Sequence, residues 1–176
     1  MNTLKDIHIR ELVQDDADKF LVVMQKSQSF HFPYITAPQT REEFEYYFQK
    51  SQLPDQRCYL AINSSQTIIG VFNISGIVRG VFQSAYLGYF ANVQFASQGA
   101  MSQALKLVLK EIFLELKLHR IEANIQPTNK SSIRLITKNG FLKEGFSPRY
   151  LKINGQWCDH LRFALLYEDW LANQYD

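Results

Sequence analysis

The sequence predicts a mixed αβ protein of the α+β class, in which helices cover both faces of one mixed sheet. Seven segments read as strands, and helical segments interrupt them too irregularly for a doubly wound sheet. One long segment carries a continuous apolar stripe of helical period. Near the C-terminus, Asn154-Gly155 predicts a tight hairpin, because both residues accept positive φ.

The N-terminal segment is expected to form a strand over 8–13 and then a helix. Asp15-Asp16 offers an N-cap for this helix. Its apolar stripe consists of Ala17, Phe20, Leu21 and Met24. Residues 28–38 are expected to be irregular and hold the aromatic run Phe30-His31-Phe32-Pro33-Tyr34. This run either plugs a core edge or lines an acceptor cleft.

The next segment is predicted to form a helix and a hairpin. Thr40 and Glu43 have the spacing of a capping box, which predicts a helix over 41–50. Two strand-like segments follow at 57–63 and 68–77, around a short polar turn.

The central part of the chain predicts a strand, helix and strand crossover. A strand over 85–92 precedes a helix over 99–117, and the segment 119–125 alternates with strand period. The helix stripe consists of Met101, Leu105, Val108, Leu109, Ile112, Phe113 and Leu116. Such a crossover connects two parallel strands, and the connection is right-handed by default.

The C-terminal part predicts a short helix over 131–138 and the final hairpin. The helix ends at Asn139-Gly140, and the strands of the hairpin cover 141–153 and 156–166. A last helical turn is expected around 168–173.

Length and composition limit the classes of protein. The chain has 176 residues, which favours a single domain over 1–176 at about 100–200 residues per domain. Hydrophobic residues make up 46% and the net charge is +2, so neither disorder nor bulk nucleic-acid binding is expected. The N-terminus up to Asp6 is polar, and no apolar run approaches the length of a membrane span.

Cysteine and histidine usage argues against a metal site. Cys58 and Cys158 are far apart, so the sequence favours a reduced, cytoplasmic protein without a disulfide or zinc framework. The histidines are dispersed and show no ligand spacing: His8, His31, His119 and His160.

Two strand-to-helix turns are candidates for anion binding. Ser97, Gln98 and Gly99 open the long helix, and the segment 129–132 opens the shorter one. Free backbone N–H groups at such helix starts bind phosphate. On local grounds the first is also an ordinary turn, and Asn129 or Ser131 is also a simple N-cap.

Six motifs between residues 86 and 170 form a recognisable set: Leu118-His119-Arg120-Ile121-Glu122-Ala123, Pro127-x-Asn129-x-x-Ser132, Asn139-Gly140-Phe141-x-x-Glu144-Gly145, Tyr150-Leu151-x-Ile153-Asn154-Gly155-x-Trp157-x-Asp159-His160, Glu168-Asp169-Trp170 and Tyr86-Leu87-Gly88-Tyr89. Together they resemble the GNAT superfamily of acetyltransferases, and more narrowly the ribosomal-protein-alanine and -serine N-acetyltransferases. The resemblance is dense from 85 to 170, whereas from 7 to 80 it depends on the order of elements.

The resemblance implies a GNAT-like fold with a mostly antiparallel, splayed sheet of about seven strands. Its fourth and fifth strands would part to admit acetyl-CoA as cosubstrate. The pantetheine would pair with the backbone of Phe90, Ala91 and Asn92. The pyrophosphate would lie on the turn formed by Ser97, Gln98, Gly99, Ala100, Met101 and Ser102, with Asn129 contacting the cosubstrate from the second helix.

The pyrophosphate turn departs from the family pattern. Ala96 stands where the family usually has a polar residue, and Ser97 stands where it has glycine. If position 97 requires positive φ, serine costs about 1 kcal/mol. The serine hydroxyl is also able to donate to a phosphate.

The resemblance implies direct attack of an amine on the thioester. An α-amine with a pKa of about 7.7–8.0 requires little of a general base. Glu122 and Glu144 are the candidate bases, and a water relay is an alternative. Many relatives protonate the leaving thiolate with a tyrosine where this chain has Ile136. The ribosomal-protein group is instead proposed to use a serine that matches Ser132, so the resemblance implies Ser132 as the donor, with Tyr150 as the second choice. A backbone N–H near Ala91 would serve the oxyanion.

The expected function is therefore an acetyl-CoA-dependent N-acetyltransferase, acting on the N-terminal α-amine of a (ribosomal) protein or peptide. Two alternatives stay open: a small-molecule amine acetyltransferase, and a non-catalytic acyl-CoA-binding module with a weakened turn. The acceptor side is expected within 28–55. A basic acceptor would require acidic residues at the cleft, for which the candidates are Glu42, Glu43, Glu45 and Asp159. The run Arg41-Glu42-Glu43 is also typical of a solvated helix face. No metal, nucleic-acid or membrane partner is expected, and a homodimer stays open.

Overall fold

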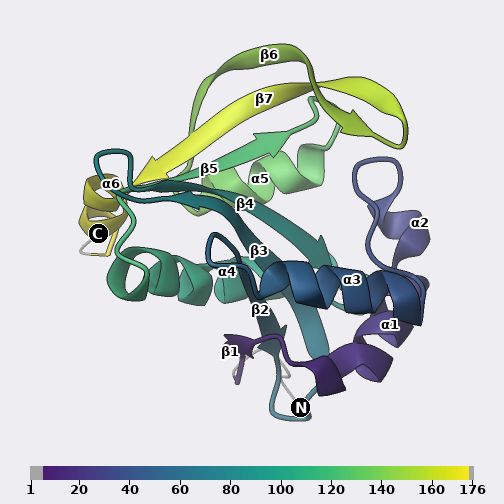
Figure 1. Cartoon of the computed structure of the whole chain (residues 1–176). Helices are drawn as coiled ribbons and strands as arrows, with labels where there is room; N and C mark the ends of the chain where they lie inside the picture. Colours follow the sequence, from purple (N-terminus) through teal and green to yellow (C-terminus); the bar gives the residue numbers. More distant parts are fainter. Residues whose placement is uncertain (1–5, 175–176) are drawn as a thin grey trace.

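A computed structural model describes residues 6–174 of the chain, so most of the polar N-terminus, from Met1 to Lys5, lies outside the described residues. Seven strands form one sheet in the order β1-β2-β3-β4-β5-β7-β6 (Figure 1). The strands are β1 (His8–Glu11), β2 (Arg57–Ile62), β3 (Ile68–Val78), β4 (Ser84–Ala91), β5 (Arg120–Ile125), β6 (Leu142–Ile153) and β7 (Gln156–Leu166). Neighbouring strands are antiparallel except β4 and β5, which are parallel. The predicted mixed, mostly antiparallel sheet is thereby confirmed.

Helices pack on both faces of this sheet, as predicted. They are α1 (Ala17–Lys26), α2 (Gln28–His31), α3 (Arg41–Ser51), α4 (Ala100–Lys110), α5 (Lys130–Lys138) and α6 (Tyr167–Ala172). Leu105 of α4 and Ile136 of α5 are buried in the core on one face, while Phe20 of α1 and Phe44 of α3 are buried in the core on the other. Alternate residues of the central strands supply the two cores, as expected for a sheet that is covered on both faces.

The start of α3 follows the predicted capping box. The Thr40 hydroxyl accepts a hydrogen bond from the Glu43 backbone N–H at 3.2 Å, and the Glu43 carboxylate accepts from the Thr40 N–H at 3.2 Å. These two bonds satisfy donors that the first turn of the helix cannot pair.

Two local predictions in the N-terminal segment need correction. Asp16 stands at the N-cap position of α1, but its side chain does not cap the helix. Its carboxylate instead accepts from the Arg10 guanidinium at 2.6 and 2.7 Å and from the Val13 N–H at 2.9 Å. The segment expected to be irregular begins with the short helix α2, because His31 N–H reaches back to the Ser27 carbonyl at 3.0 Å.

The long helix also ends differently from the prediction. α4 stops at Lys110, and residues Glu111–Glu115 form one π-helical turn. Ile112 and Phe113 are buried in this turn. Both residues thus keep the place in the core that the predicted apolar stripe gave them.

The sheet splays between β4 and β5. These strands pair at only three positions: Ser84 with Arg120, Ala85 with Ile121, and Tyr86 with Glu122. Beyond them the two strands diverge, so the backbone groups of β4 past Tyr86 have no strand partner on that side. The Asn92 N–H donates to Ile69 of β3 at 2.9 Å, and by alternation the polar backbone groups of Ala91 face the gap.

The β6–β7 turn bends over the loop that follows α2 (Figure 1). Asn154 and Gly155 have φ of 49° and 82°, which confirms the predicted Asn-Gly turn. The Asn154 amide donates to the Pro33 carbonyl at 3.1 Å, and its oxygen accepts from the Thr36 hydroxyl at 2.8 Å. The turn therefore closes one end of the open side of the sheet.

Candidate active site

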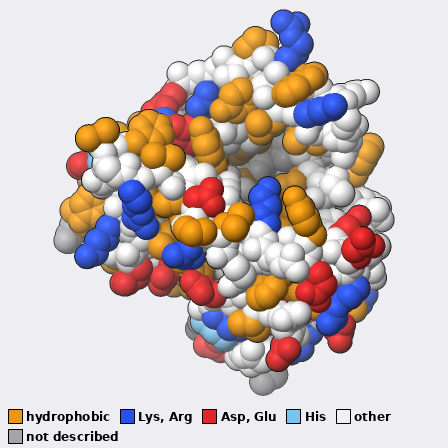
Figure 2. All heavy atoms as spheres, viewed as in Figure 1, with side chains coloured by type: hydrophobic (Ala, Val, Ile, Leu, Met, Phe, Trp, Pro, Cys, Tyr) orange, Lys and Arg blue, Asp and Glu red, His pale blue; other side chains and the backbone are white. Residues whose placement is uncertain are grey.

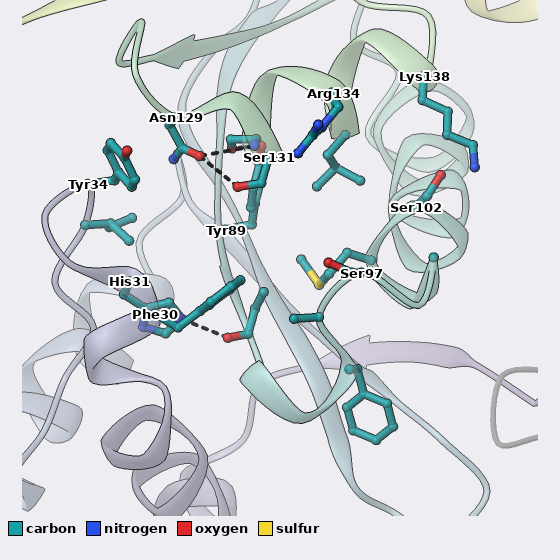
Figure 3. Close-up of a pocket in the computed structure, with 18 residues that line it drawn as sticks. Phe30, His31, Tyr34, Tyr89, Ser97, Ser102, Asn129, Ser131, Arg134 and Lys138 are labelled. Carbon is teal, nitrogen blue, oxygen red and sulfur yellow. Dashed lines mark hydrogen bonds between the residues drawn. The ribbon is translucent and has the colours of Figure 1, made fainter.

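Two cavities meet where β4 and β5 diverge. The larger, of about 520 Å³, lies between the loop after α2, the end of β4 and the N-termini of α4 and α5 (Figure 3). The smaller, of about 90 Å³, lies in the gap between β4 and β5. Five of their lining residues are shared by both cavities: Tyr34, Ile35, Tyr89, Asn129 and Ser132. The two cavities therefore adjoin each other at these residues.

The turn before α4 forms one wall of the larger cavity. Ser97 and Gly99 have φ of 60° and 81°, so both lie in the left-handed region. The condition under which serine at this position costs about 1 kcal/mol is therefore met. A Cβ on Gly99 would have no atom within 4 Å, so the backbone here is open to a ligand.

The structure brings together most, but not all, of the residues predicted to bind the cosubstrate. Those that line the larger cavity are Ala91, Ser97, Gly99, Met101, Ser102 and Asn129. Those that do not are Phe90, Asn92, Gln98 and Ala100.

The four residues that do not line the larger cavity have structural roles of their own. Phe90 belongs to the core on the opposite face of the sheet, and Ala100 is buried in the core beneath α4. The Asn92 amide donates to the Ile68 carbonyl at 2.7 Å, and its oxygen caps the following turn through the Gln94 N–H at 3.0 Å. The Gln98 amide donates to the Gln94 carbonyl at 2.8 Å.

Asn129 has the N-cap role that its local sequence allowed, whereas its contact with a cosubstrate stays a prediction. It is the N-cap of α5, since its side-chain oxygen accepts from the Ser132 N–H at 3.1 Å. The same oxygen accepts from the Ser131 hydroxyl at 3.0 Å (Figure 3). Because Asn129 also lines both cavities, it fixes the start of α5 at their junction.

Sequence reasoning missed two cations on this wall. Arg134 and Lys138 of α5 line the larger cavity, opposite the turn before α4 (Figure 3). Their spacing of four residues along a helix places them on one face, which was the available signal. Two cations and two helix N-termini around one cavity suit a ligand that carries several phosphates.

The most distinctive polar contact at the junction is the hydrogen bond between the hydroxyls of Tyr89 and Ser132. Tyr89 comes from β4 and Ser132 from the first turn of α5. Burial raises the pKa of Tyr89 to about 12, so its phenol stays protonated. The sequence predicted Ser132 but not Tyr89, and only the fold brings the two together.

The other predicted catalytic residues lie outside both cavities. Glu122 is buried, and its carboxylate accepts from Arg120 Nε at 3.0 Å and from Arg162 Nη2 at 2.6 Å. The hydrogen bond from Arg120 lowers the pKa of Glu144, which is paired on the sheet surface. Tyr150 lies beneath the Arg162 guanidinium, whose central carbon is 4.9 Å from the ring centre.

The aromatic run from Phe30 to Tyr34, which begins within α2, is divided between the cavity and the surface. Phe30, His31 and Tyr34 line the larger cavity, whereas Phe32 is 68% exposed. His31 Nε2 lies 2.8 Å from the Ala91 carbonyl oxygen (Figure 3). Because a carbonyl only accepts, Nε2 carries the proton and ties α2 to the end of β4.

The cavities carry no negative side chains. Among the described residues that line them, none is aspartate or glutamate. The predicted acidic candidates lie elsewhere: Glu43 caps α3, Glu45 pairs with Arg41 at 3.2 Å, and Asp159 accepts from the Arg149 N–H at 2.7 Å.

Figure 2 shows a hollow between the β6–β7 side and the side built by α1–α3.

The described part of the chain holds neither a cluster of metal ligands nor a membrane-spanning helix. Within residues 6–174, no cluster of three or more His, Cys, Asp or Glu could hold a metal ion. Within the same residues, no helix has the length and apolar character needed to cross a membrane.

Comparisons with known proteins agree on one family. The acetyltransferase (GNAT) domain model matches residues 6–142. The probable N-acetyltransferase YjcK of Bacillus subtilis is 34% identical over 175 residues, covering 94% of this chain and 96% of that protein. The [ribosomal protein uS5]-alanine N-acetyltransferase of Escherichia coli is 44% identical over 103 residues, which cover 58% of this chain and 53% of that enzyme.

Solved structures give the same result. The ribosomal-protein-S5-alanine acetyltransferase of Vibrio fischeri superposes with a TM-score of 0.84 at 25% identity, covering 94% of this chain and 96% of that one. The spermidine N-acetyltransferase of Vibrio cholerae, solved with CoA and spermine, shares the fold with a TM-score of 0.81 at 19% identity, covering 94% and 98%. The matched domain, the splayed sheet and these relatives together show that the chain belongs to the GNAT family of N-acetyltransferases.

Proposed function

We propose that this protein transfers the acetyl group of acetyl-CoA to the N-terminal α-amine of a protein or peptide. The observation that carries the proposal is the junction of the two cavities at Tyr89 and Ser132. A cosubstrate in the larger cavity and an amine in the smaller one would meet there. An acceptor of this kind would be encountered in the cytoplasm.

The larger cavity suits acetyl-CoA. In this proposal the pyrophosphate lies against the turn at Ser97 and Gly99, with Arg134 and Lys138 nearby. The pantetheine extends along the edge of β4 that has no β5 partner, toward Ala91, whose carbonyl already accepts from His31. This arrangement places the thioester near Ser132, which donates a proton to the leaving thiolate, while Tyr89 supports its hydroxyl. Catalysis by one such donor is typically worth about 10²–10⁴-fold.

The absence of carboxylates from the described linings favours an α-amine over a polyamine. A polyamine carries several ammonium groups, and each would lose its hydration in this site without gaining a counter-charge. A peptide N-terminus carries one amine, and about a tenth of it is neutral at pH 7. The similarity to a ribosomal-protein-alanine acetyltransferase makes a ribosomal protein beginning with alanine the first acceptor to test.

We do not propose a catalytic role for Glu122 or Tyr150, the other two residues that the sequence suggested. Both oxygens of Glu122 are held by arginines, so proton uptake would break a buried ion pair. Tyr150 is stacked against Arg162, outside the cavities. We therefore retain Ser132 as the catalytic residue among the three that the sequence suggested.

The test assays the full chain and its variants with different acceptors. Incubation with acetyl-CoA and an alanine-initiated peptide should release CoA and add one acetyl group, detected by mass spectrometry. An N-terminally blocked copy of the peptide and spermidine should react at least about tenfold more slowly. Ser132→Ala should lower kcat about a hundredfold, whereas Thr137→Ala, an exposed change on the same helix, should not. Equal turnover of the blocked peptide or a preference for spermidine would refute the α-amine assignment.

A further inference from the structure

A buried histidine faces the smaller cavity from β7, and neither the motifs nor the comparisons give it a role. His160 is 3% exposed and lines the cavity between β4 and β5 together with Tyr34, Tyr89 and Ser132. It is therefore on the acceptor side of the proposed thioester position, in the middle of β7, one residue beyond the last pair that β7 forms with β5.

The hydrogen bonds of the ring determine which nitrogen is basic. His160 Nδ1 lies 2.9 Å from the carbonyl oxygen of Cys158. A carbonyl oxygen only accepts, so Nδ1 carries the proton, and in the neutral ring Nε2 is left with a lone pair. Within residues 6–174, no side chain or backbone group hydrogen-bonds Nε2. The ring is thus an oriented proton acceptor beside the cavity.

The surroundings of His160 contain few charges. The titratable and charged groups around it are Tyr34 from the loop before α3, Tyr89 from β4, Tyr150 from β6, Asp159 next in the chain and Arg162 two residues along β7. Burial lowers the pKa of His160 below 6.5, although the Cys158 carbonyl and Asp159 act in the opposite direction. The imidazole is accordingly neutral at pH 7.

We propose that His160 Nε2 is the general base that deprotonates the acceptor ammonium, an inference that rests on the proposed α-amine transfer. The ammonium gives one proton to Nε2, and the neutral nitrogen forms a bond to the acetyl carbonyl carbon as the carbon–sulfur bond breaks. The second proton of the nitrogen passes to the thiolate through the Ser132 hydroxyl, which gives CoA thiol. His160 returns the first proton to solvent.

The best variant is His160→Asn, because the asparagine N–H takes the place of Nδ1–H toward Cys158 and only the basic nitrogen is lost. His119→Asn is the matched control, since His119 is half exposed and pairs with Glu168 away from both cavities. Two peptides are compared, one with an N-terminal alanine and one with an N-terminal aminooxyacetyl group, whose amine is already unprotonated at pH 7.

For the alanine peptide, His160→Asn should lower kcat/KM about tenfold at pH 7, because only about a tenth of the α-amine is neutral without a base, while the aminooxy peptide should change less than about threefold. The acidic limb of the wild-type pH profile that reports His160 should disappear in the variant. An equal loss for both peptides would assign His160 a structural role and overturn the proposal, and so would unchanged kinetics.

Failure of the role of His160 and failure of the proposed function give different results. Nitrogen NMR of the wild-type imidazole should show the Nδ1–H tautomer at pH 7, and a protonated Nε2 would overturn the inference without any activity assay. If wild-type protein acetylates neither peptide, the proposed function itself is refuted. That result differs from an active wild type whose His160→Asn variant is equally active, which refutes the role of His160 alone.

Discussion

Gly99→Ala separates the cost of backbone strain from the loss of a ligand contact. Gly99 has φ of +81°, and a Cβ there would have no atom within 4 Å. The variant should therefore be destabilised by backbone strain alone, about 1 kcal/mol. For a chain of this length that corresponds to a fall in Tm of about 2–4 °C.

Gly80→Ala is the matched control for this variant. Gly80 lies in the β3–β4 turn, has φ of +71° and has equally open surroundings, but it does not line the cavities. Both variants should lose the same stability in a thermal melt. Only Gly99→Ala should lose affinity for acetyl-CoA, because its methyl group would occupy the space through which a phosphate approaches the backbone.

The size of the affinity loss follows from the contact removed. A hydrogen bond to a charged group is worth about 1.5–3 kcal/mol, which corresponds to about a 10- to 150-fold rise in Kd. Calorimetric titration with acetyl-CoA measures it directly. If Gly99→Ala binds as tightly as Gly80→Ala, the pyrophosphate does not lie on this turn and the assignment of the larger cavity is wrong.

Three further variants test the turn, the hydroxyl pair and the fold. Ser97→Gly should change the Kd for acetyl-CoA less than about threefold, because Ser97 already holds φ of 60°; a tenfold gain in titration would show that serine weakens the site. Tyr89→Phe should lower kcat about tenfold, and the double variant with Ser132→Ala should be no slower than Ser132→Ala alone if the pair acts as a unit in steady-state assays. Asp16→Asn should cost about 2 kcal/mol at pH 7 in urea unfolding. Burial alone would raise the pKa of Asp16, but its hydrogen bonds to Arg10 and Val13 outweigh burial and lower the pKa below 3.8. The stabilisation by Asp16 is therefore lost as the pH falls through the folded pKa. If the difference in free energy of unfolding between Asp16→Asn and wild type grew in acid, the argument would be contradicted.

Most of the fold was predictable because its signals are local. The hairpin at Asn154-Gly155, the capping box at Thr40 and the apolar stripe of α4 are each read from a few neighbouring residues. The π-helical turn after Lys110 was not predictable, since an apolar stripe of helical period does not distinguish one wide turn from a regular one.

The site was predictable only in part because its residues come from separate elements. Motifs located Gly99, Asn129 and Ser132, which line the cavities. Tyr89 and His160 stand in recognisable motifs, but no local pattern assigned them a role, since that role depends on the gap between β4 and β5 and on the partner of each polar atom. Glu122 illustrates the opposite case, because its motif was recognisable while its two arginine partners were not.

The three-residue pairing between β4 and β5 also has a mechanical consequence. It divides the sheet into a four-stranded half, β1–β4, and a three-stranded half, β5–β7, which share few backbone hydrogen bonds. Local opening at this seam should therefore require less free energy than unfolding of either half, and amide exchange at β5 should be faster than at β3. A cosubstrate that spans the seam would hold both halves, so saturation with CoA should slow exchange on either side of it together.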